Sequence, residues 1–259
     1  MNYIIYDLEF NQEYPSNKSI KTDNYFKLPF EIIQIGAVKL NKNFKIISKF
    51  NALVKPTLYT TIHPYVEDLT KINNDQLNSS NSFPKVFEDF VKFIGKNYPV
   101  LCVWNTTDIK ELIRNIEFHK LQPSLIPKQY IDIQAYASKY FNAPKGSKIG
   151  LRNAIEILKI PIESEFHNAF NDAYYTSKVF KSIYNPDMKP IKYIPPRPKR
   201  NNLFKEKLDT VALINQFEKI YNRKMSEEEI SIIKLAYIMG KTHQFTIKDQ
   251  APTKNIPSN

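Results

Sequence analysis

The sequence predicts an α/β fold in which helices flank a mixed sheet, followed by a small C-terminal helical appendage. Two observations support this prediction. Apolar runs of strand length open the chain and later alternate with longer segments whose apolar residues recur every three or four positions. After residue 185, prolines and basic residues accumulate, which marks the end of the predicted main domain.

Five strands are expected in the sheet. Three apolar runs near the start are followed by two shorter ones, at residues 2–8, 31–40, 44–54, 99–104 and 129–133. The second and third runs are joined by the turn Leu40-Asn41-Lys42-Asn43, which predicts an antiparallel hairpin. Helices are expected before, between and after the later strands, at residues 66–72, 84–96, 108–119, 133–141, 149–158 and 168–184.

Two carboxylates, Asp7 and Glu9, stand where the first apolar run ends. Successive side chains of a strand point to opposite faces, so residues two apart share a face. Two unpaired acids side by side repel each other and resist desolvation, and a bound cation would neutralise both. The pair therefore predicts a divalent metal site, with an acid pair that simply faces water as the alternative.

Two further acids occupy comparable positions downstream. Asp108 follows the apolar run Val100–Trp104 and opens a predicted helix. Asp172 lies early in another predicted helix, and His167 stands five residues before it. Four acids and one histidine therefore form a candidate constellation. Other polar residues are expected to be structural: Asp132 as a helix cap, and His63, His119 and His243.

These residues resemble the motifs of a known family, the DEDDh 3′→5′ exonucleases. The family's three motifs are matched by Asp7-Leu8-Glu9, by Asp108 with Leu112, and by His167 with Asp172. Asn168 stands where the tyrosine variant of the family has its tyrosine, so the resemblance is to the histidine variant. It covers residues 1–185 and implies an RNase H-like fold with a mixed five-stranded sheet.

The resemblance implies a metal-dependent phosphodiester hydrolase. Asp7, Glu9, Asp108 and Asp172 would bind two Mg²⁺ or Mn²⁺ ions, with Asp7 bridging both and Asp108 acting largely through water. His167 would be the general base for the attacking water, a role that histidine fills most often. The implied reaction releases nucleoside 5′-monophosphates from the 3′ end of single-stranded or overhanging nucleic acid.

Departures from the family's pattern bear on the substrate. Phe10 and Asn11 replace the Thr-Gly or Thr-Thr that often follows the glutamate, and Lys71 replaces a glycine. We expect Phe10, Asn11 and Trp104 to contact nucleic acid, with Phe10 stacking on a base unless it fills the core. The long segment from Asn11 to Pro29 is more typical of the RNA-processing and sporulation-associated branch, so RNA is slightly favoured over DNA.

Composition agrees with a nucleic-acid partner. The 259 residues carry a formal net charge of +11, and excess Lys and Arg favour binding to phosphates, although a merely basic protein is the alternative. Cys102 is the single cysteine and cannot form an internal disulfide, as in a reducing compartment. No apolar run is long enough to span a membrane. The sequence therefore predicts a cytoplasmic protein without a membrane partner.

Beyond the main domain, residues 186–204 are predicted to form a basic, proline-rich linker. A helical hairpin is expected over residues 205–245, with a tail over 246–259. Its helices are expected at 205–222 and 226–240. Eight apolar residues are expected to pair these helices face to face: Ile214, Phe217, Ile220, Tyr221, Ile230, Ile233, Leu235 and Ala236.

Sequence signals also define the second of these helices. Ser226 with Glu229 forms a predicted capping box at its start, and Gly240 is its predicted end. The hairpin carries no catalytic signature, and a protein partner is possible through it.

Two noncatalytic alternatives remain open from the sequence. One is a nucleic-acid-binding module that keeps the fold, and the other is a protein-interaction scaffold whose basic tail recruits RNA or ribosomes. The complete set of carboxylates and His167 favour the enzyme. Hydrolysis that depends on a divalent metal would separate the three hypotheses.

Overall fold

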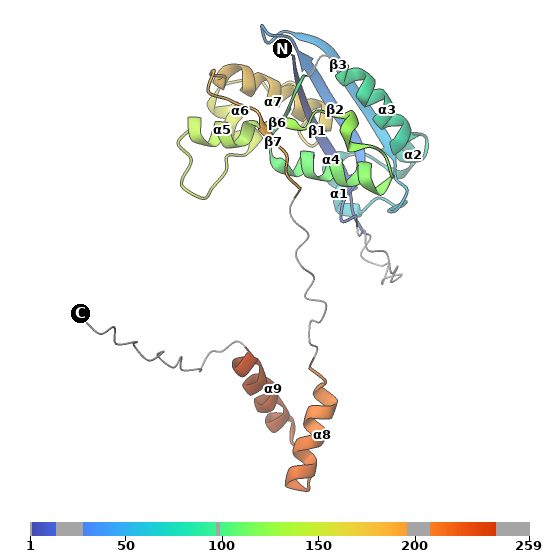
Figure 1. The fold of residues 1–259 in the computed structure, drawn as a ribbon, viewed down its shortest axis with the longest axis vertical. Helices are drawn as coiled ribbons and strands as arrows, with labels where there is room; N and C mark the ends of the chain where they lie inside the picture. The colour runs from blue at the N-terminus through green and yellow to red at the C-terminus, as the bar shows by residue number, and fades with distance from the viewer. Residues whose placement is uncertain (1, 14–27, 97–98, 196–207, 242–259) are drawn as a thin grey trace, which may run out of the picture. The chain divides into compact units, whose positions relative to one another are not determined.

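The computed structural model describes residues 2–13, 28–96, 99–195 and 208–241. These residues belong to two compact units, Met1–Pro195 and Pro196–Asn259 (Figure 1). The first unit extends beyond the predicted domain boundary at residue 185. Much of the segment from Asn11 to Pro29, part of the predicted linker and the tail lie outside the described residues.

Within the described residues, a seven-stranded mixed sheet in the order β4-β3-β2-β1-β5-β6-β7 forms the centre of the first unit. β1 runs antiparallel to β2 and parallel to β5. The five expected strands are present, and two short strands at the edges correct the expected number to seven. The strands are β1 Tyr3–Asn11, β2 Glu31–Leu40, β3 Ile46–Lys55, β4 Asn81–Ser82, β5 Val100–Val103, β6 Gln129–Asp132 and β7 Ile191–Lys192.

β7 lies inside the segment that was predicted to be a linker. Ile191 pairs with Tyr130, and Lys192 pairs with Gln129, antiparallel to β6. Two residues are too few to show the alternation of a strand, and the neighbouring prolines are typical of linkers and of sheet edges alike. The chain therefore leaves the first unit only after it has completed this edge strand.

The predicted hairpin between β2 and β3 is present. Asn41 organises its turn, because its side-chain oxygen accepts the N–H groups of Asn43 at 2.9 Å and Lys45 at 3.0 Å. Phe44 adopts a positive φ of 56°, and its ring stacks on Tyr3 at 5.6 Å. The turn thereby also closes the end of the core.

The six predicted helices of the first unit are present, with ends shifted by no more than two residues. The helix α2 was not expected, because five residues are too few to show helical periodicity. A capping box between Asn73 and Gln76 stabilises its start. The helices are α1 Pro64–Thr70, α2 Asn74–Asn78, α3 Phe83–Ile94, α4 Thr106–Phe118, α5 Ile133–Tyr140, α6 Leu151–Ile157 and α7 Ala169–Ile183.

Alternation along β1 divides its side chains between two cores. Every second residue packs in the core that includes α3 and α4, namely Ile4, Tyr6 and Leu8. Tyr3 and Ile5 pack in the core that includes α5, α6 and α7. Asp7 and Glu9 continue this second series, so they face the side of the sheet that α7 covers (Figure 1). The fold thus directs the acid pair toward α7.

The second unit contains α8, Thr210–Tyr221, and α9, Glu227–Lys241. The predicted capping box of α9 is confirmed, because Ser226 Oγ accepts the Glu229 N–H at 3.3 Å and the Glu229 carboxylate accepts the Ser226 N–H at 2.9 Å. The described helix runs one residue past the predicted end at Gly240. Gly240 does not adopt the positive φ of a terminating glycine, and the helix continues to Lys241.

Among the described residues, the predicted contact between α8 and α9 is formed by half-buried side chains and is incomplete. Four of the eight apolar residues are half-buried: Ile214, Phe217, Ile230 and Ile233. The other four are exposed: Ile220, Tyr221, Leu235 and Ala236. Two helices by themselves meet along one narrow stripe, so apolar residues beside that stripe face solvent. Within the described part of the chain, no helix has the length and apolar character needed to cross a membrane.

Candidate active site

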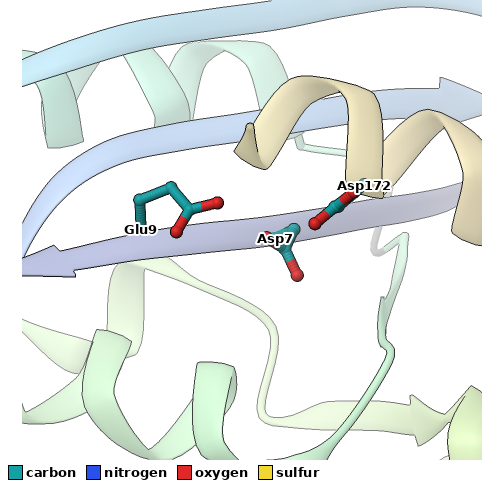
Figure 2. Close-up of side chains that lie close together, drawn as sticks. All are labelled: Asp7, Glu9 and Asp172. Atoms are coloured by element: carbon teal, nitrogen blue, oxygen red, sulfur yellow. The ribbon is translucent and has the colours of Figure 1, made fainter. Parts of the chain in front are cut away.

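Three of the predicted metal ligands converge between β1 and α7. Asp7 and Glu9 come from β1, and Asp172 comes from the first turn of α7. One ligand oxygen of each residue lies within 4.8 Å of the others. Figure 2 shows the three carboxylates turned toward one another. The shared face predicted for Asp7 and Glu9 is therefore present, and the fold adds Asp172 to it.

Crowded negative charge shifts the protonation of this group. Burial, with repulsion from Asp172 and Asp108, raises the pKa of Glu9 to about 8. Burial and then repulsion from Asp108, Glu9 and Asp172 raise the pKa of Asp7 well above its usual range. The group as it stands therefore disfavours full ionisation, and a nearby positive charge would restore it.

Asp108 lies beside these three residues on the first turn of α4, which Asn105 caps. Its side chain is buried, and its Oδ2 has no hydrogen-bond partner among the described residues. Burial, with repulsion from Asp132 and Asp172, raises its pKa to about 8. Asp108 falls outside the group of three, and its negative charge contributes to the raised pKa of Asp7.

The loop before α7 orients Asp172. The N–H of His167 donates to Asp172 Oδ2 at 3.2 Å. Burial raises the pKa of Asp172 to about 6 and outweighs this hydrogen bond, which lowers it. His167 has a φ of 62°, a left-handed conformation that is uncommon outside glycine and that is often retained at functional sites. The same turn leaves the His167 side chain exposed.

α7 rests directly on β2 at a glycine. A Cβ on Gly36 would lie 2.1 Å from backbone atoms of Ala169 and Phe170, so only glycine permits this approach. Gln34, on the same strand, accepts the Ala169 N–H at 3.1 Å. From the sequence, both residues are expected only as parts of the strand at residues 31–40. The available signal was a glycine inside an otherwise apolar strand.

The four acids fit the predicted metal ions. All are carboxylates, the ligands that Mg²⁺ and Mn²⁺ prefer. Asp108 Oδ2 and Asp172 Oδ1 are buried without a hydrogen-bond partner in the described part of the chain. Buried and unpaired carboxylate oxygens are costly, and a bound cation would relieve that cost. The donor set and its unsatisfied oxygens therefore suit a divalent cation.

Two residues predicted to contact nucleic acid are buried instead. The Asn11 side chain is fully buried and bonds backbone groups of the segment before α1 at 2.9 to 3.0 Å. Trp104 packs in the core that includes α5, α6 and α7. Neither side chain is available to a nucleic acid, and the prediction is corrected for both. Phe10 is half-buried, with its ring 6.0 Å from that of Phe30, and its contact with nucleic acid stays a prediction.

The polar residues expected to be structural have structural contacts. Asp132 caps α5 by accepting the Ala135 N–H at 3.0 Å, as predicted. His63 caps α1, and the His119 ring stacks on Phe83 at 4.8 Å. The remaining member of this set, His243, lies outside the described residues. The single cysteine, Cys102, is buried.

A comparison with protein families now decides the assignment. A family model described as exonuclease, RNase_T, matches residues 4–180. The chain belongs to this exonuclease family. The matched region contains every candidate ligand from Asp7 to Asp172, and the resemblance to the DEDDh exonucleases is confirmed. The RNA-processing and sporulation-associated branch stays a prediction. The comparison with curated proteins gives no match.

Solved structures of exonucleases share the fold. The nuclease domain of 3′hExo, a DEDDh family member bound to rAMP, is 20% identical, with a TM-score of 0.61 over 75% of this chain and 97% of that domain. A full-length 3′-exonuclease is 20% identical, with a TM-score of 0.58 over 70% of this chain and 59% of its own length. S. pombe Pop2p, with Mg²⁺ and Mn²⁺ bound, is 18% identical, with a TM-score of 0.53 over 70% of this chain and 82% of its own.

These likenesses establish the RNase H-like fold of the first unit. This chain spans little more than half of the full-length 3′-exonuclease, so the likeness concerns the nuclease domain. Family and fold together identify the first unit as an exonuclease domain, a phosphodiester hydrolase.

Proposed function

We propose that the protein removes nucleoside 5′-monophosphates from the 3′ end of single-stranded or overhanging nucleic acid, with RNA slightly favoured over DNA. The reaction would require Mg²⁺ or Mn²⁺, two ions per site, held by Asp7, Glu9, Asp108 and Asp172. The observation that supports this most strongly is the convergence of three carboxylates within 4.8 Å, beside a fourth that has an unpaired buried oxygen.

Each element has a defined part in this proposal. Bound divalent ions would supply charge for an attacking hydroxide and a departing oxyanion. β1 fixes Asp7 and Glu9 on one face, and α7 brings Asp172 to that face. α4 adds Asp108 at its first turn. The acids therefore come from three rigid elements, which suits a site that must keep its geometry during turnover.

His167 would accept the proton of the attacking water. Its backbone is fixed by the bond to Asp172, and its side chain is exposed, so both water and substrate can reach it. It borders a cavity of about 380 Å³, whose walls also include Asn51, Lys71 and Asn171. None of the four acids lines this cavity, but it offers space for the end of a nucleic-acid strand next to the proposed base.

Charge and likeness support a nucleic-acid substrate. The net charge of +11 favours a polyanion. The 3′hExo domain, whose structure contains rAMP, covers most of this chain at a TM-score of 0.61, which supports RNA as the preferred substrate. Phe10 follows Glu9 directly, and its half-buried ring would stack on the terminal base.

The test is hydrolysis of RNA and DNA strands of the same sequence, labelled at the 5′ end, with Mg²⁺, Mn²⁺ or EDTA. We expect a ladder that shortens from the 3′ end, that disappears with EDTA, and that is lost in Asp7→Ala and His167→Ala. The strand that is hydrolysed faster would identify the preferred sugar, ribose or deoxyribose. A circular strand of the same sequence has no end and should stay intact.

The result would also decide between the enzyme and its alternatives. Strands that are bound but never shortened would leave a nucleic-acid-binding module or a scaffold. Cleavage of the circular strand would contradict an exonuclease. The exonuclease family match and the convergent acids favour the enzyme over both alternatives.

A further inference from the structure

Gln34 links the elements that carry the candidate ligands. It lies on β2 directly opposite Glu9 of β1, and it is 2% exposed. Its Oε1 accepts the N–H of Ala169, the first residue of α7, at 3.1 Å. Its Nε2 donates to Oδ1 of Asn51 on β3 at 2.9 Å. One buried amide thus ties the start of α7 to the sheet beside the site.

This bond completes the cap of α7. The first N–H groups of a helix have no partner within the helix. The Asn168 side chain accepts two of them at 3.1 and 3.4 Å, and its backbone carbonyl accepts the Asp172 N–H at 2.9 Å. The Ala169 N–H is accepted by Gln34 instead. The sheet, and not only the loop, therefore determines where α7 begins.

The chemistry of this position suits an amide. The Ala169 N–H needs an acceptor, and Asn51 Oδ1 needs a donor, so one carboxamide satisfies both groups at once. A glutamate here would lose the donor and would add a negative charge opposite Glu9. Three carboxylates already converge there within 4.8 Å, so a further negative charge would increase the repulsion.

We propose that Gln34, oriented by Asn51, is a positioning residue that fixes Asp172 against Glu9 and thereby sets the affinity of the site for divalent metal. The inference rests on the proposed function of that site. Asp172 lies in the same first turn as Ala169, so a shift of the helix start moves its carboxylate directly. Partners that orient metal ligands typically change metal affinity or activity by about 10- to 100-fold when they are removed.

The experiment measures Mn²⁺ binding by calorimetry on the full chain without substrate, together with kcat and KM for a labelled oligonucleotide. Gln34→Met keeps the length of the side chain and removes both hydrogen bonds. We expect the Kd for Mn²⁺ to rise by about 10- to 100-fold, and kcat at fixed metal to fall by a similar factor. Gln34 also lines the cavity proposed for the strand, so the Kd for Mn²⁺ without substrate, and not KM, decides whether Gln34 acts on the metal site.

Gln134→Met is the matched control. Gln134 lies in α5 of the same unit, and its Nε2 donates to the Ile149 carbonyl at 3.0 Å. The same substitution there removes a hydrogen bond that involves neither α7 nor any of the four candidate ligands, and it should leave the Kd for Mn²⁺ unchanged. If both methionine variants change this Kd equally, Gln34 is merely structural and the inference is overturned.

A gentler variant covers the case in which Gln34→Met does not fold. Asn51 is exposed on β3, and Asn51→Ala removes the partner that orients the amide. Because Asn51 also borders the cavity proposed for the strand, the deciding readout is the Kd for Mn²⁺ without substrate. We expect the Kd for Mn²⁺ to rise by about fivefold, the effect of one hydrogen bond. An unchanged Kd and kcat in Asn51→Ala would overturn the inference. Wild-type protein that neither binds Mn²⁺ nor hydrolyses a strand would overturn the proposed function itself, and this inference with it.

Discussion

Glu9 in the first unit and Glu229 in the second are carboxylates in opposite environments, and their pKa values are shifted in opposite directions. Burial, with repulsion from Asp172 and Asp108, raises the pKa of Glu9 to about 8. Hydrogen bonds from Arg223 and Ser226 lower the pKa of Glu229 to about 2. Glu9 is crowded by other acids and has no ion pair among the described residues, whereas Glu229 is half-buried and forms an ion pair with Arg223. In the arrangement around Glu9, a bound cation would offset the repulsion between the carboxylates; around Glu229, Arg223 already supplies a positive charge.

The two units differ in the same way in their apolar residues. In the first unit, side chains from distant strands and helices cover one another, and residues such as Ile4 and Leu112 have no exposed surface. Among the described residues of the second unit, none is buried, and Val211 and Ile232 are 69% and 65% exposed. Helical periodicity is present in both units. The acids that converge between β1 and α7 stand beside such a core, which the described part of the second unit does not have.

The largest expected effect comes from Asp7→Asn. Metal ions supply several kcal/mol of transition-state stabilisation, so hydrolysis should fall by roughly a thousandfold or more. The metal-free variant should melt higher than the wild type, because one member of a repelling group becomes neutral. Hydrolysis rates and thermal melting in EDTA check this. Glu229→Gln is the matched control and should keep its hydrolysis rate. Loss of hydrolysis in that variant would contradict the assignment of the metal site to the first unit.

Gly36→Ala should produce the next largest effect. The added Cβ would meet the backbone of α7 at 2.1 Å, so the variant should lose about 3 kcal/mol of unfolding free energy, at the upper end for overpacking. Denaturant unfolding measures this loss. Gly150→Ala introduces the same methyl group at the start of α6, where a Cβ meets nothing within 4 Å, and should be close to neutral. Equal losses in both variants would show that α7 does not rest on Gly36.

Metal-free protein should become less stable as pH rises from 5 to 8. Burial, with repulsion from neighbouring acids, raises the pKa of Glu9 and of Asp108 to about 8. In this range the folded state therefore binds protons that the unfolded chain has released, and the unfolding free energy falls with pH. The melting temperature should drop by several degrees in EDTA and less with Mg²⁺. A melting temperature that rises over this range in EDTA would contradict the crowding of these acids.

The smallest effect should follow removal of the second unit. A chain that ends after Pro195 keeps both cores, the seven-stranded sheet and all four candidate ligands. Its main melting transition and its kcat on a short oligonucleotide should match those of the full chain. Calorimetric melting and hydrolysis rates measure both quantities. A large loss of either would mean that the second unit supports the nuclease fold.

Patterns of adjacent residues could be predicted from the sequence, and contacts between distant segments could not. The alternation of β1 places Asp7 and Glu9 on one face without knowledge of the fold. The contact of Gly36 with α7 depends on how two segments more than a hundred residues apart are packed. β4 and β7 are too short to show a period.

Position next to a motif gave the wrong role for two side chains, Asn11 and Trp104. Asn11 was expected at the substrate because it follows the acid pair, but its amide bonds three backbone groups inside the fold. Trp104 follows an apolar strand and continues its core. Polar amides and aromatic rings serve buried structure as readily as binding, so their position in a motif does not determine their role.

The most direct test of the central claim is a calorimetric titration of Mn²⁺ into the wild type, Asp7→Asn and Glu229→Gln. If the converging carboxylates of β1 and α7 form the metal site, the wild type and Glu229→Gln should show saturable binding, and Asp7→Asn should lose it. Mn²⁺ binding that is unchanged in Asp7→Asn would contradict the account, because the ions would then lie elsewhere in the protein.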